Sequence, residues 1–455
     1  MSSPLAPASP TPSKERLSNT GMPKLWIVFL ICFLYNFAAC QENTWSLQKC
    51  IDKALANNIE LKIRQLEVKR IEKSRNSVWN QLLPTVSFNG SQSYNFGSTI
   101  DPSTNGRVSS NIQFDNFYIN ANMNLIDFTS FANAQKNKID IEKAKADKEV
   151  IENEYKLQIL DSYYQALFSQ ELLKIQKEQF KNAQFNLNRI SQEVEIGKKP
   201  KSDLYDIQLS FAQEEKRILE TQQLYNFQKL QLFQLMNVND VVILIVILIS
   251  NPAGISVETS IKINSPKIKF AALNYESSLK DLRLQRAQNL PTLSTFYNIS
   301  SFYYKPLNQP NTLVQSFSNQ IGDNKNQQVG IQLSIPIFNG FRNSKKNVAA
   351  KITSEKNKLI INQEQQKIDN HIALENQNQL NYLQLQNKFI ETLLYAKASF
   401  TTNQAKFLAG KIDSVILSSI KNQLLSSEYD VLKNNLQLQY TNLKINLIAK
   451  NNFSL

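Results

Sequence analysis

Side chains that could carry catalysis or bind a metal are few in this sequence and lie far apart. The one histidine, His371, is inside a polar stretch, and no cluster of Cys, His and carboxylates has the spacing of metal ligands. Glu214 and Glu215 are neighbours on the expected surface of a helix, where acidic residues need no catalytic role. The Gly197-Lys198 pair lacks the further glycines of a phosphate-binding loop. The sequence therefore predicts no catalytic residue, no cofactor and no metal site.

Cys40 is the residue whose setting most suggests a chemical modification. Residues 25–35 form a short apolar run after a lysine, and the small residues Ala38 and Ala39 follow it. This order predicts a secretory signal that is too short to span a membrane. Two hypotheses for the cleavage site stay open, namely attachment of a lipid to Cys40 or plain cleavage near Gln41.

Residues 1–40 are accordingly predicted to be a disordered leader with the signal peptide, and either Met1 or Met22 could start translation. Cys32 would leave with the signal, so the mature chain would keep Cys50 and, in one hypothesis, Cys40. This content predicts no disulfide framework despite export.

The formal net charge of +13 could indicate an anionic partner such as nucleic acid. The lysines, however, alternate with Glu, Gln and Asn along the expected helices, as they do on a solvated face. No compact block of Lys and Arg with interleaved aromatic residues occurs, so no nucleic-acid partner is expected.

Three segments recur in the same order at a separation of roughly 210 residues, which predicts an internal repeat. QLLPTVS at 81–87 is similar to QNLPTLS at 288–294, and LIDFTSFANAQK is similar to IPIFNGFRNSKK. EIGKKPKSDL is matched in the same way by LAGKIDSVIL. Duplication of one structural unit explains all three matches.

Each repeat is expected to contain a helix, a β-hairpin, a long helix and a return helix. The expected ranges in the first repeat, 41–240, are a hairpin at 84–126, a long helix at 131–196 and a return helix at 202–236. The expected ranges in the second repeat, 264–455, are a hairpin at 291–338, a long helix at 341–409 and a return helix at 414–449. The linker at 241–263 contains the apolar run Val241–Ile249, which is too short to span a membrane and is predicted to be a buried strand.

The long helices account for most of the length of the chain. Neither 131–196 nor 341–409 contains Gly or Pro, and at a rise of ~1.5 Å per residue each helix would reach roughly 100 Å. A narrow apolar stripe such as Ile151, Tyr155 and Ile159 is typical of coiled-coil packing. The predicted fold class is therefore mainly α with a small β component. An exported coiled-coil interaction protein would explain the helices but not the strands.

Four strands are predicted from the alternation of apolar and uncharged polar residues. The apolar positions predicted to face lipid are Val86, Phe88, Val329, Ile331 and Leu333. Partner strands are expected near 112–125 and 293–303, and the first changes phase between Phe114 and Phe117, which predicts a β-bulge. The links at 98–111 and 305–327 are expected to be exposed loops.

Four strands per chain cannot close a barrel, and open strand edges are not tolerated in lipid. The sequence therefore predicts a transmembrane β-barrel that several chains share. Three copies would give twelve strands and two copies would give eight, so counting alone leaves both open.

Several short motifs follow one another in the chain: the opening around Trp45, the two Leu-Pro-Thr strand openings at 83–85 and 290–292, the PIFNG at 336–340 and the FLAGKID turn. In these motifs the sequence resembles the TolC-type outer-membrane efflux family, and the resemblance covers about 41–450. One departure is Asp127, with the residues after it, where a glycine turn would be more typical.

The resemblance implies a homotrimer in the cell outer membrane, with a shared twelve-stranded barrel and an α-barrel of helices that crosses the periplasm. It implies a channel-tunnel subunit, not an enzyme, that exports small molecules or drugs in a tripartite efflux system. The partners would be a periplasmic adaptor protein and an inner-membrane transporter. An exit duct for type I protein secretion would share these features and stays open.

The helix turns are the expected docking point for the adaptor. Gly197 and Gly410 are predicted to end their helices in a left-handed backbone, and Lys198, Lys411 and Asp413 lie beside them. The charged residues expected at both turns are Lys198, Lys199, Lys201, Lys397, Lys406 and Lys411 against Glu193, Glu195, Asp203 and Asp413. This positive balance predicts weak cation preference or mild anion preference if the lysines line the passage. The alternative, that they point outward to the adaptor or solvent, stays open.

Overall fold

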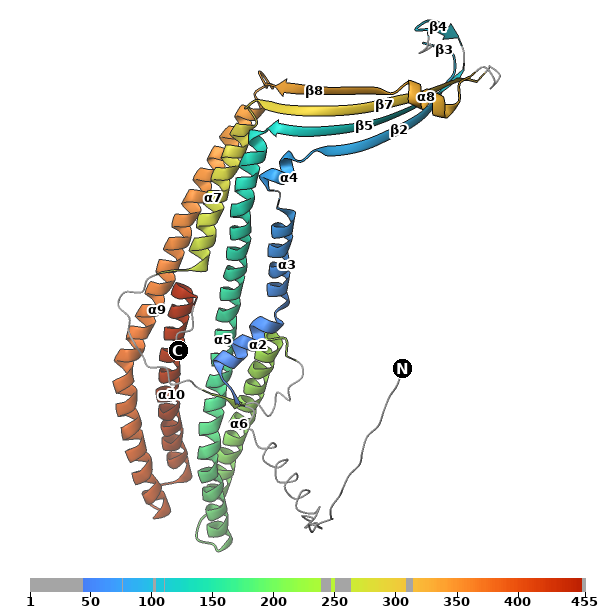
Figure 1. Ribbon diagram of the computed structural model, residues 1–455. Helices are drawn as coiled ribbons and strands as arrows, with labels where there is room; N and C mark the ends of the chain where they lie inside the picture. Colours follow the sequence, from blue (N-terminus) through green and yellow to red (C-terminus); the bar gives the residue numbers. More distant parts are fainter. Residues whose placement is uncertain are drawn as a thin grey trace, which may run out of the picture.

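The computed structural model describes residues 44–75, 77–100, 104–109, 111–238, 247–249, 263–307 and 314–451. The expected signal peptide, Cys40 and most of the expected linker, including 241–246, lie outside the described residues. The helices lie side by side, and the sheet extends sideways from one end of them (Figure 1).

Two very long helices, each followed by an antiparallel return helix, organise the chain. The helices before the second hairpin of strands are α2 (Leu47–Asn57), α3 (Ile59–Ser74), α4 (Val78–Leu82), α5 (Phe128–Glu195), α6 (Lys201–Leu235) and α7 (Pro266–Ala287). Helix α8 (Phe317–Asp323) lies between the two strands of the second hairpin, and α9 (Arg342–Leu408) and α10 (Ser414–Lys450) follow that hairpin. The long helices α5 and α9 and their return helices have bounds within three residues of the ranges expected from the sequence.

The helices lie next to one another in a layer, and toward the turns α6 also contacts α10. In the half nearest the sheet, α5 packs between α3 and α7, and α9 packs against the other side of α7 (Figure 1). In the other half, α6 packs beside α5, and α10 lies between α5 and α9. Each half of the layer therefore contains four helices next to one another.

The strands repeat this side-by-side order. An antiparallel sheet in the order β2-β5-β7-β8 consists of β2 (Thr85–Asn95), β5 (Ile112–Ile126), β7 (Thr292–Pro306) and β8 (Asn326–Ser334). A short hairpin of β3 (Ser98–Ile100) and β4 (Arg107–Ser109) lies in the link that was expected to be a loop. Within the described chain, β2 and β8 each have one edge without a partner strand.

The strand register separates the side chains into two chemically different faces, because directly opposite residues of adjacent strands share a face. The apolar face contains Val86, Phe88, Phe117, Ile119, Ala121, Tyr297, Ile299, Val329, Ile331 and Leu333. All five residues predicted from the sequence to face lipid therefore lie on one face. Toward the end of the sheet far from the helices, the same face carries Asp115 and Lys305.

The bulge expected between Phe114 and Phe117 is absent, and that prediction is wrong. β5 pairs with β2 without a break, and the two aromatic residues lie on opposite faces of the sheet. Phe114 packs against Phe302, with the ring centroids 5.6 Å apart. Phe114 is an apolar residue on the polar face, and this exception to the alternation led to the wrong prediction of a bulge. The strand is irregular instead between Asn124 and Ile126, next to α5.

The second link, expected at 305–327 to be an exposed loop, contains α8, which lies against β7. The buried side chain of Gln320 accepts a hydrogen bond from the Tyr304 N–H at 2.9 Å and donates to the Tyr304 carbonyl at 3.0 Å. Because β8 pairs with β7 only as far as Ser300, this amide satisfies backbone groups of β7 beyond the end of the ladder.

The junctions between strands and long helices differ in the two halves. Asp127 is the N-cap of α5, and its carboxylate accepts hydrogen bonds from the Thr129 N–H at 2.9 Å and the Ser130 hydroxyl at 2.6 Å. At the start of α9, Gly340 and Phe341 instead have positive φ angles of 66° and 62°. The side-chain cap explains why the first half needs no glycine turn.

A small parallel pairing joins the two halves at the middle of the helical layer. β1 (Thr44–Trp45) pairs with β6 (Ile247–Leu248), which is the described part of the apolar run in the expected linker. Leu248 is buried, whereas Ile247 and Ile249 are each 44% exposed. Within the described part of this run, the predicted burial is therefore correct for Leu248 only.

The largest apolar cluster of the described chain surrounds this pairing, and Tyr163 and Gln170 bind its backbone. The Tyr163 hydroxyl accepts from the Ile249 N–H at 3.1 Å and lies 2.7 Å from the Ile249 carbonyl oxygen and 2.9 Å from that of Trp45. The Gln170 amide pairs with both backbone groups of Leu248 at 2.8 Å. The same cluster encloses Cys50, and burial raises the pKa of its thiol to about 12, so the thiol stays protonated.

Among the described helices, none is both long enough and apolar enough to span a membrane.

Replacing Tyr163 by Phe should lower the midpoint of thermal unfolding, because the backbone of Trp45 and Ile249 loses the hydrogen bonds of the Tyr163 hydroxyl. Such a loss costs about 1–3 kcal/mol. The measurement is far-UV circular dichroism during heating of the purified protein, with Tyr395→Phe as the matched control because Tyr395 is 63% exposed. Equal midpoints for the two variants would contradict this role of Tyr163.

Candidate functional site at the helix turns

The turns after α5 and α9 have the same backbone geometry. Gly197 and Gly410 have φ angles of +75° and +71°, so both are left-handed, as the sequence predicts. In the first turn the Gly197 N–H bonds to the Val194 carbonyl at 3.0 Å, and the N–H of the next residue reaches the Glu193 carbonyl at 2.8 Å. The second turn repeats both hydrogen bonds at the same distances. These pairs satisfy carbonyl groups that a helix end otherwise leaves unpaired.

Both turns lie at the end of the layer opposite the sheet (Figure 1). A cluster of buried apolar residues from all four helices joins them: Ile190, Ile207, Ala396, Phe400, Phe407, Leu417 and Leu424. The α5–α6 turn and the α9–α10 turn therefore form one site and not two separate ends.

Arg189 links the two turns directly. Its guanidinium donates to the carbonyl groups of Phe407 at 3.2 Å and Leu408 at 3.3 Å, and it lies 4.4 Å from the centroid of the Phe407 ring. Those carbonyls belong to the last turn of α9, where the helix dipole places partial negative charge. A cation from α5 thus stabilises the end of α9, and Glu193 holds the same side chain at 3.9 Å.

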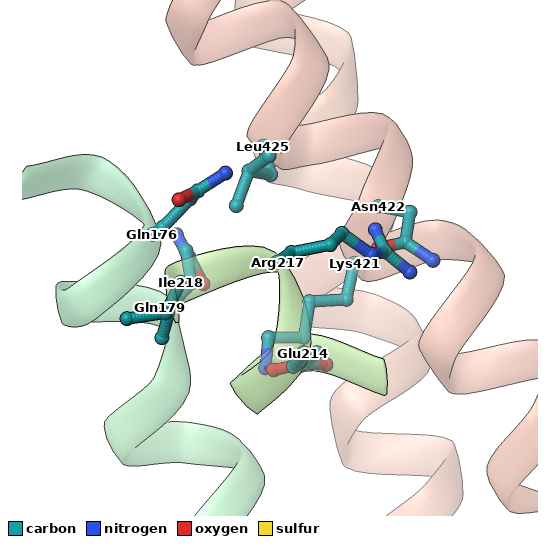
Figure 2. Close-up of a pocket in the computed structure, with 8 residues that line it drawn as sticks. All are labelled: Gln176, Gln179, Glu214, Arg217, Ile218, Lys421, Asn422 and Leu425. Carbon is teal, nitrogen blue, oxygen red and sulfur yellow. Dashed lines mark hydrogen bonds and ion pairs between the residues drawn. The ribbon is translucent and has the colours of Figure 1, made fainter. Parts of the chain in front are cut away.

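Farther from the turns, an ion pair joins α6 to α10. The Lys421 ammonium lies 2.7 Å from the Glu214 carboxylate, and the two side chains are only 6% and 14% exposed. Figure 2 shows Lys421 reaching down to Glu214 while Arg217 extends to Asn422, whose side-chain oxygen accepts at 3.0 Å. Burial lowers the pKa of Lys421, and the nearby carboxylate of Glu214 opposes that shift.

The seam between the two helix pairs is polar and leaves small spaces beside this ion pair. Two cavities of about 20 Å³ are lined by both Glu214 and Lys421, and each has room for one water molecule. The side-chain oxygens of Gln176 and Asn186, which line one cavity each, are buried and have no hydrogen-bond partner in the described chain. The geometry therefore suits hydration of the seam.

The residues predicted at the docking point are on the surface. Gly197, Lys198, Gly410, Lys411 and Asp413 are all exposed. The Asp413 carboxylate also caps α10 by accepting a hydrogen bond from the Ile416 N–H at 2.8 Å. A Cβ atom at either glycine would have no atom within 4 Å apart from those of its chain neighbours.

The charge balance of the turns is more positive than the sequence count, because Arg189 was not included. Seven cations then face four carboxylates, which is +3 per chain. Arg189–Glu193 and Lys199–Asp203 form ion pairs, so the excess remains on the exposed lysines.

Sequence reasoning missed Arg189, Glu214 and Lys421 as members of this site. Glu214 was expected on a helix surface, but it is mostly buried against Lys421. A signal was available, since Lys421 stands between Leu417 and Leu424 in the apolar stripe of its helix. His371 is exposed on α9, as expected, and the described chain contains no group of residues that could hold a metal ion.

Replacing Lys421 by Met should destabilise the turns more than replacing Lys421 and Glu214 together by Met and Leu. Loss of one partner leaves a buried charge unpaired, at a cost of about 3–5 kcal/mol, whereas replacement of a whole buried pair is often close to neutral. Hydrogen exchange of amides near the turns measures the difference. The matched control is the exposed Lys216–Glu220 pair of α6, and an effect there as large as at Lys421 would refute the argument.

Solved structures of outer-membrane channels have the same fold. The Campylobacter jejuni CmeC outer membrane channel is 15% identical with a TM-score of 0.71, over 98% of this chain and 93% of that chain. The outer membrane protein VceC of Vibrio cholerae is 14% identical with a TM-score of 0.71, over 88% and 95%. CusC is 15% identical with a TM-score of 0.72, over 89% and 92%. At these identities the likeness shows the fold alone, an α-barrel joined to a β-barrel.

The sequence itself identifies the family. No curated protein matches the chain. A model of the family described as outer membrane efflux protein matches residues 50–238 and 259–449, which is well over half of the chain. Proteins of this family are channels and not enzymes. The chain therefore belongs to the outer membrane efflux protein family, and it is a channel of the outer membrane whose helices extend into the periplasm.

Proposed function

We propose that the chain is the subunit of a trimeric channel-tunnel that exports small molecules or drugs as the outer-membrane part of a tripartite efflux system. The observation that carries this proposal is the open layer. The described chain leaves one edge of β2 and one edge of β8 unpaired, and it does so at the two sides of the same layer.

The helices support closure of the layer by further copies. On one side, α3 exposes a stripe of apolar residues that consists of Ile59, Ile63 and Leu66. On the opposite side, α9 exposes a stripe that consists of Val348, Ile352 and Leu359. The two stripes belong to different surfaces, so they can pair only head to tail between copies, and such contacts form a ring when the rotation between copies closes. In this ring α3 and β2 of one chain pack against α9 and β8 of the next.

Three copies supply twelve strands, which fits the even-numbered barrels of outer membranes. The apolar face then lies toward lipid, and the polar face lines the passage. The helix turns lie at the far end of the tunnel, in the periplasm.

The exposed turns are the proposed contact with the partners, a periplasmic adaptor protein and an inner-membrane transporter that supplies the energy. Their net positive charge supports weak cation preference, or mild anion preference, at this end of the passage. Part of that positive charge also stabilises the helices, because cations near a helix C-terminus interact favourably with the helix dipole.

We also propose that the chain arose by duplication of one unit. The family model matches twice, and both halves contain a hairpin of strands, a long helix, a left-handed glycine and a return helix in the same order.

Replacing Phe88 or Ile331 by Arg should reduce the yield of trimers in the outer-membrane fraction. The two residues are 67% and 71% exposed on the apolar face, and a charge near the bilayer midplane costs roughly 2–4 kcal/mol in such barrels. Asn89→Arg is the matched control, because its side chain is on the polar face. The proposed orientation fails if the control loses its trimers and the two test variants keep theirs.

Replacing Gly197 and Gly410 by Trp should leave the trimer intact and abolish export. A Cβ atom at either position has no atom within 4 Å apart from those of its chain neighbours, and the strain of a left-handed residue costs about 1–2 kcal/mol at each position. Asn at both positions is the control, because Asn tolerates this backbone with a small side chain. The measurements are trimer bands on unheated gels and the drug susceptibility of cells. Loss of the trimer in the Trp variant would show that the turns serve folding and not docking.

A further inference from the structure

The polar face of the sheet contains no Asp, Glu, Lys, Arg or His in any position that the strand pairing defines. Its members are Thr85, Ser87, Asn89, Ser91, Ser93, Asn95, Ile112, Phe114, Asn116, Tyr118, Asn120, Asn122, Asn124, Thr292, Ser294, Phe296, Asn298, Ser300, Phe302, Tyr304, Pro306, Asn326, Gln328, Gly330, Gln332 and Ser334. Amides, hydroxyls and aromatic rings make up nearly all of this surface.

Folding does not require this absence of charge. Lipid excludes charge from the apolar face, but a face toward water carries no such penalty. Charged residues make up 20% of the whole chain, so a wet surface of this size would ordinarily carry several. The apolar face itself tolerates Asp115 and Lys305 toward its far end. The neutrality therefore belongs to the polar face in particular.

Hydrogen-bonding side chains form a continuous row across this face. Ser87 lies opposite Asn120, Asn120 opposite Asn298, and Asn298 opposite Gln328. Each group can both donate and accept, so the row can bind polar solutes without a preference for either sign of charge.

Aromatic rings lie against the same face. Phe114 packs against Phe302, and both side chains are half-buried in the single chain. Phe296 covers Gly330, where a Cβ atom would come within 2.5 Å of the ring, so only glycine lets the ring lie this close to β8. These rings offer planar apolar surfaces beside the amides, and such surfaces stack with planar solutes.

We infer that the polar face makes the barrel section of the passage electrically neutral, suited to uncharged or zwitterionic solutes with polar and aromatic groups and indifferent to the sign of an ion. The inference rests on the proposed function, which places this face toward the passage. Discrimination by charge then falls to the helix turns, where the net charge is +3 per chain.

The test measures the local potential on the polar face with a cysteine introduced there. Asn120→Cys is exposed to two membrane-impermeant methanethiosulfonate reagents, one cationic and one anionic, added to the outside of intact cells. The ratio of the two reaction rates, divided by the ratio for a free thiol in the same buffer, should be close to one. Ile119→Cys, on the opposite face, should react with neither reagent, and the chain without an added cysteine is the blank.

A charge placed beside the probe calibrates the measurement. Asn298→Asp in the Asn120→Cys chain puts a carboxylate directly opposite the thiol, at about 5 Å between Cα atoms. It should raise the rate ratio in favour of the cationic reagent by about three-fold or more, whereas Asn298→Ser should not change it. Gln328→Asp places the carboxylate one strand farther from the thiol, so it should shift the rate ratio less. It replaces Asn298→Asp as the calibration if that variant assembles poorly.

The outcomes distinguish failure of the neutral barrel from failure of the proposed orientation of the sheet. A rate ratio at Asn120→Cys that departs from that of the free thiol by three-fold or more overturns the neutral barrel and leaves the channel proposal intact. Labelling of Ile119→Cys together with protection of Asn120→Cys overturns the proposed orientation of the sheet instead. Labelling of Asn120→Cys at the free-thiol ratio, with the expected shift when Asn298→Asp is added, supports both.

Discussion

The need to pair backbone hydrogen-bonding groups controls this structure more than any single contact does. The sheet and the helices form one layer, and a layer has two open sides. Unpaired N–H and C=O groups on β2 and β8 would each cost several kcal/mol in lipid, where no water replaces a missing partner. A layer of this kind is stable in a membrane only as a closed ring. The proposed lipid-facing orientation of the strands and the proposed assembly with further copies both follow from that constraint.

Where the regular pairing stops, side-chain amides take over the same role. Gln320 pairs with the backbone of Tyr304 beyond the end of β8, and Gln170 pairs with the backbone of Leu248 at the edge of β6. An amide carries one acceptor and two donors, so it can imitate the backbone of a neighbouring strand. Gln320 thereby attaches the short helix α8 to β7. Gln170 in the same way attaches the short strand β6 to α5.

The elements that depend on local patterns are those that could be predicted from the sequence. Long ranges without Gly or Pro indicated α5 and α9, alternation assigned Phe88 and Ile331 to one face, and the glycines marked both turns. The elements that depend on partners distant in the chain were missed. Helix α8 is too short for periodicity to reveal, and its stability comes from contacts with β7. The Glu214–Lys421 pair joins helices far apart in sequence, so neither residue alone indicates it.

The middle of the helical layer and its end at the turns are held together by different kinds of contact. At the middle, a large apolar cluster encloses Trp45, Tyr163 and Leu248, and water cannot replace such contacts without the full cost of exposing apolar surface. Toward the turns the cluster is smaller, and Arg189, the Glu214–Lys421 pair and a Ser210–Ser418 hydrogen bond of 2.7 Å supply much of the connection. Water can take over polar contacts at a lower net cost, and the seam already has room for it beside Lys421. Separation of the α9–α10 pair from the α5–α6 pair therefore costs least at the turns and most toward the middle.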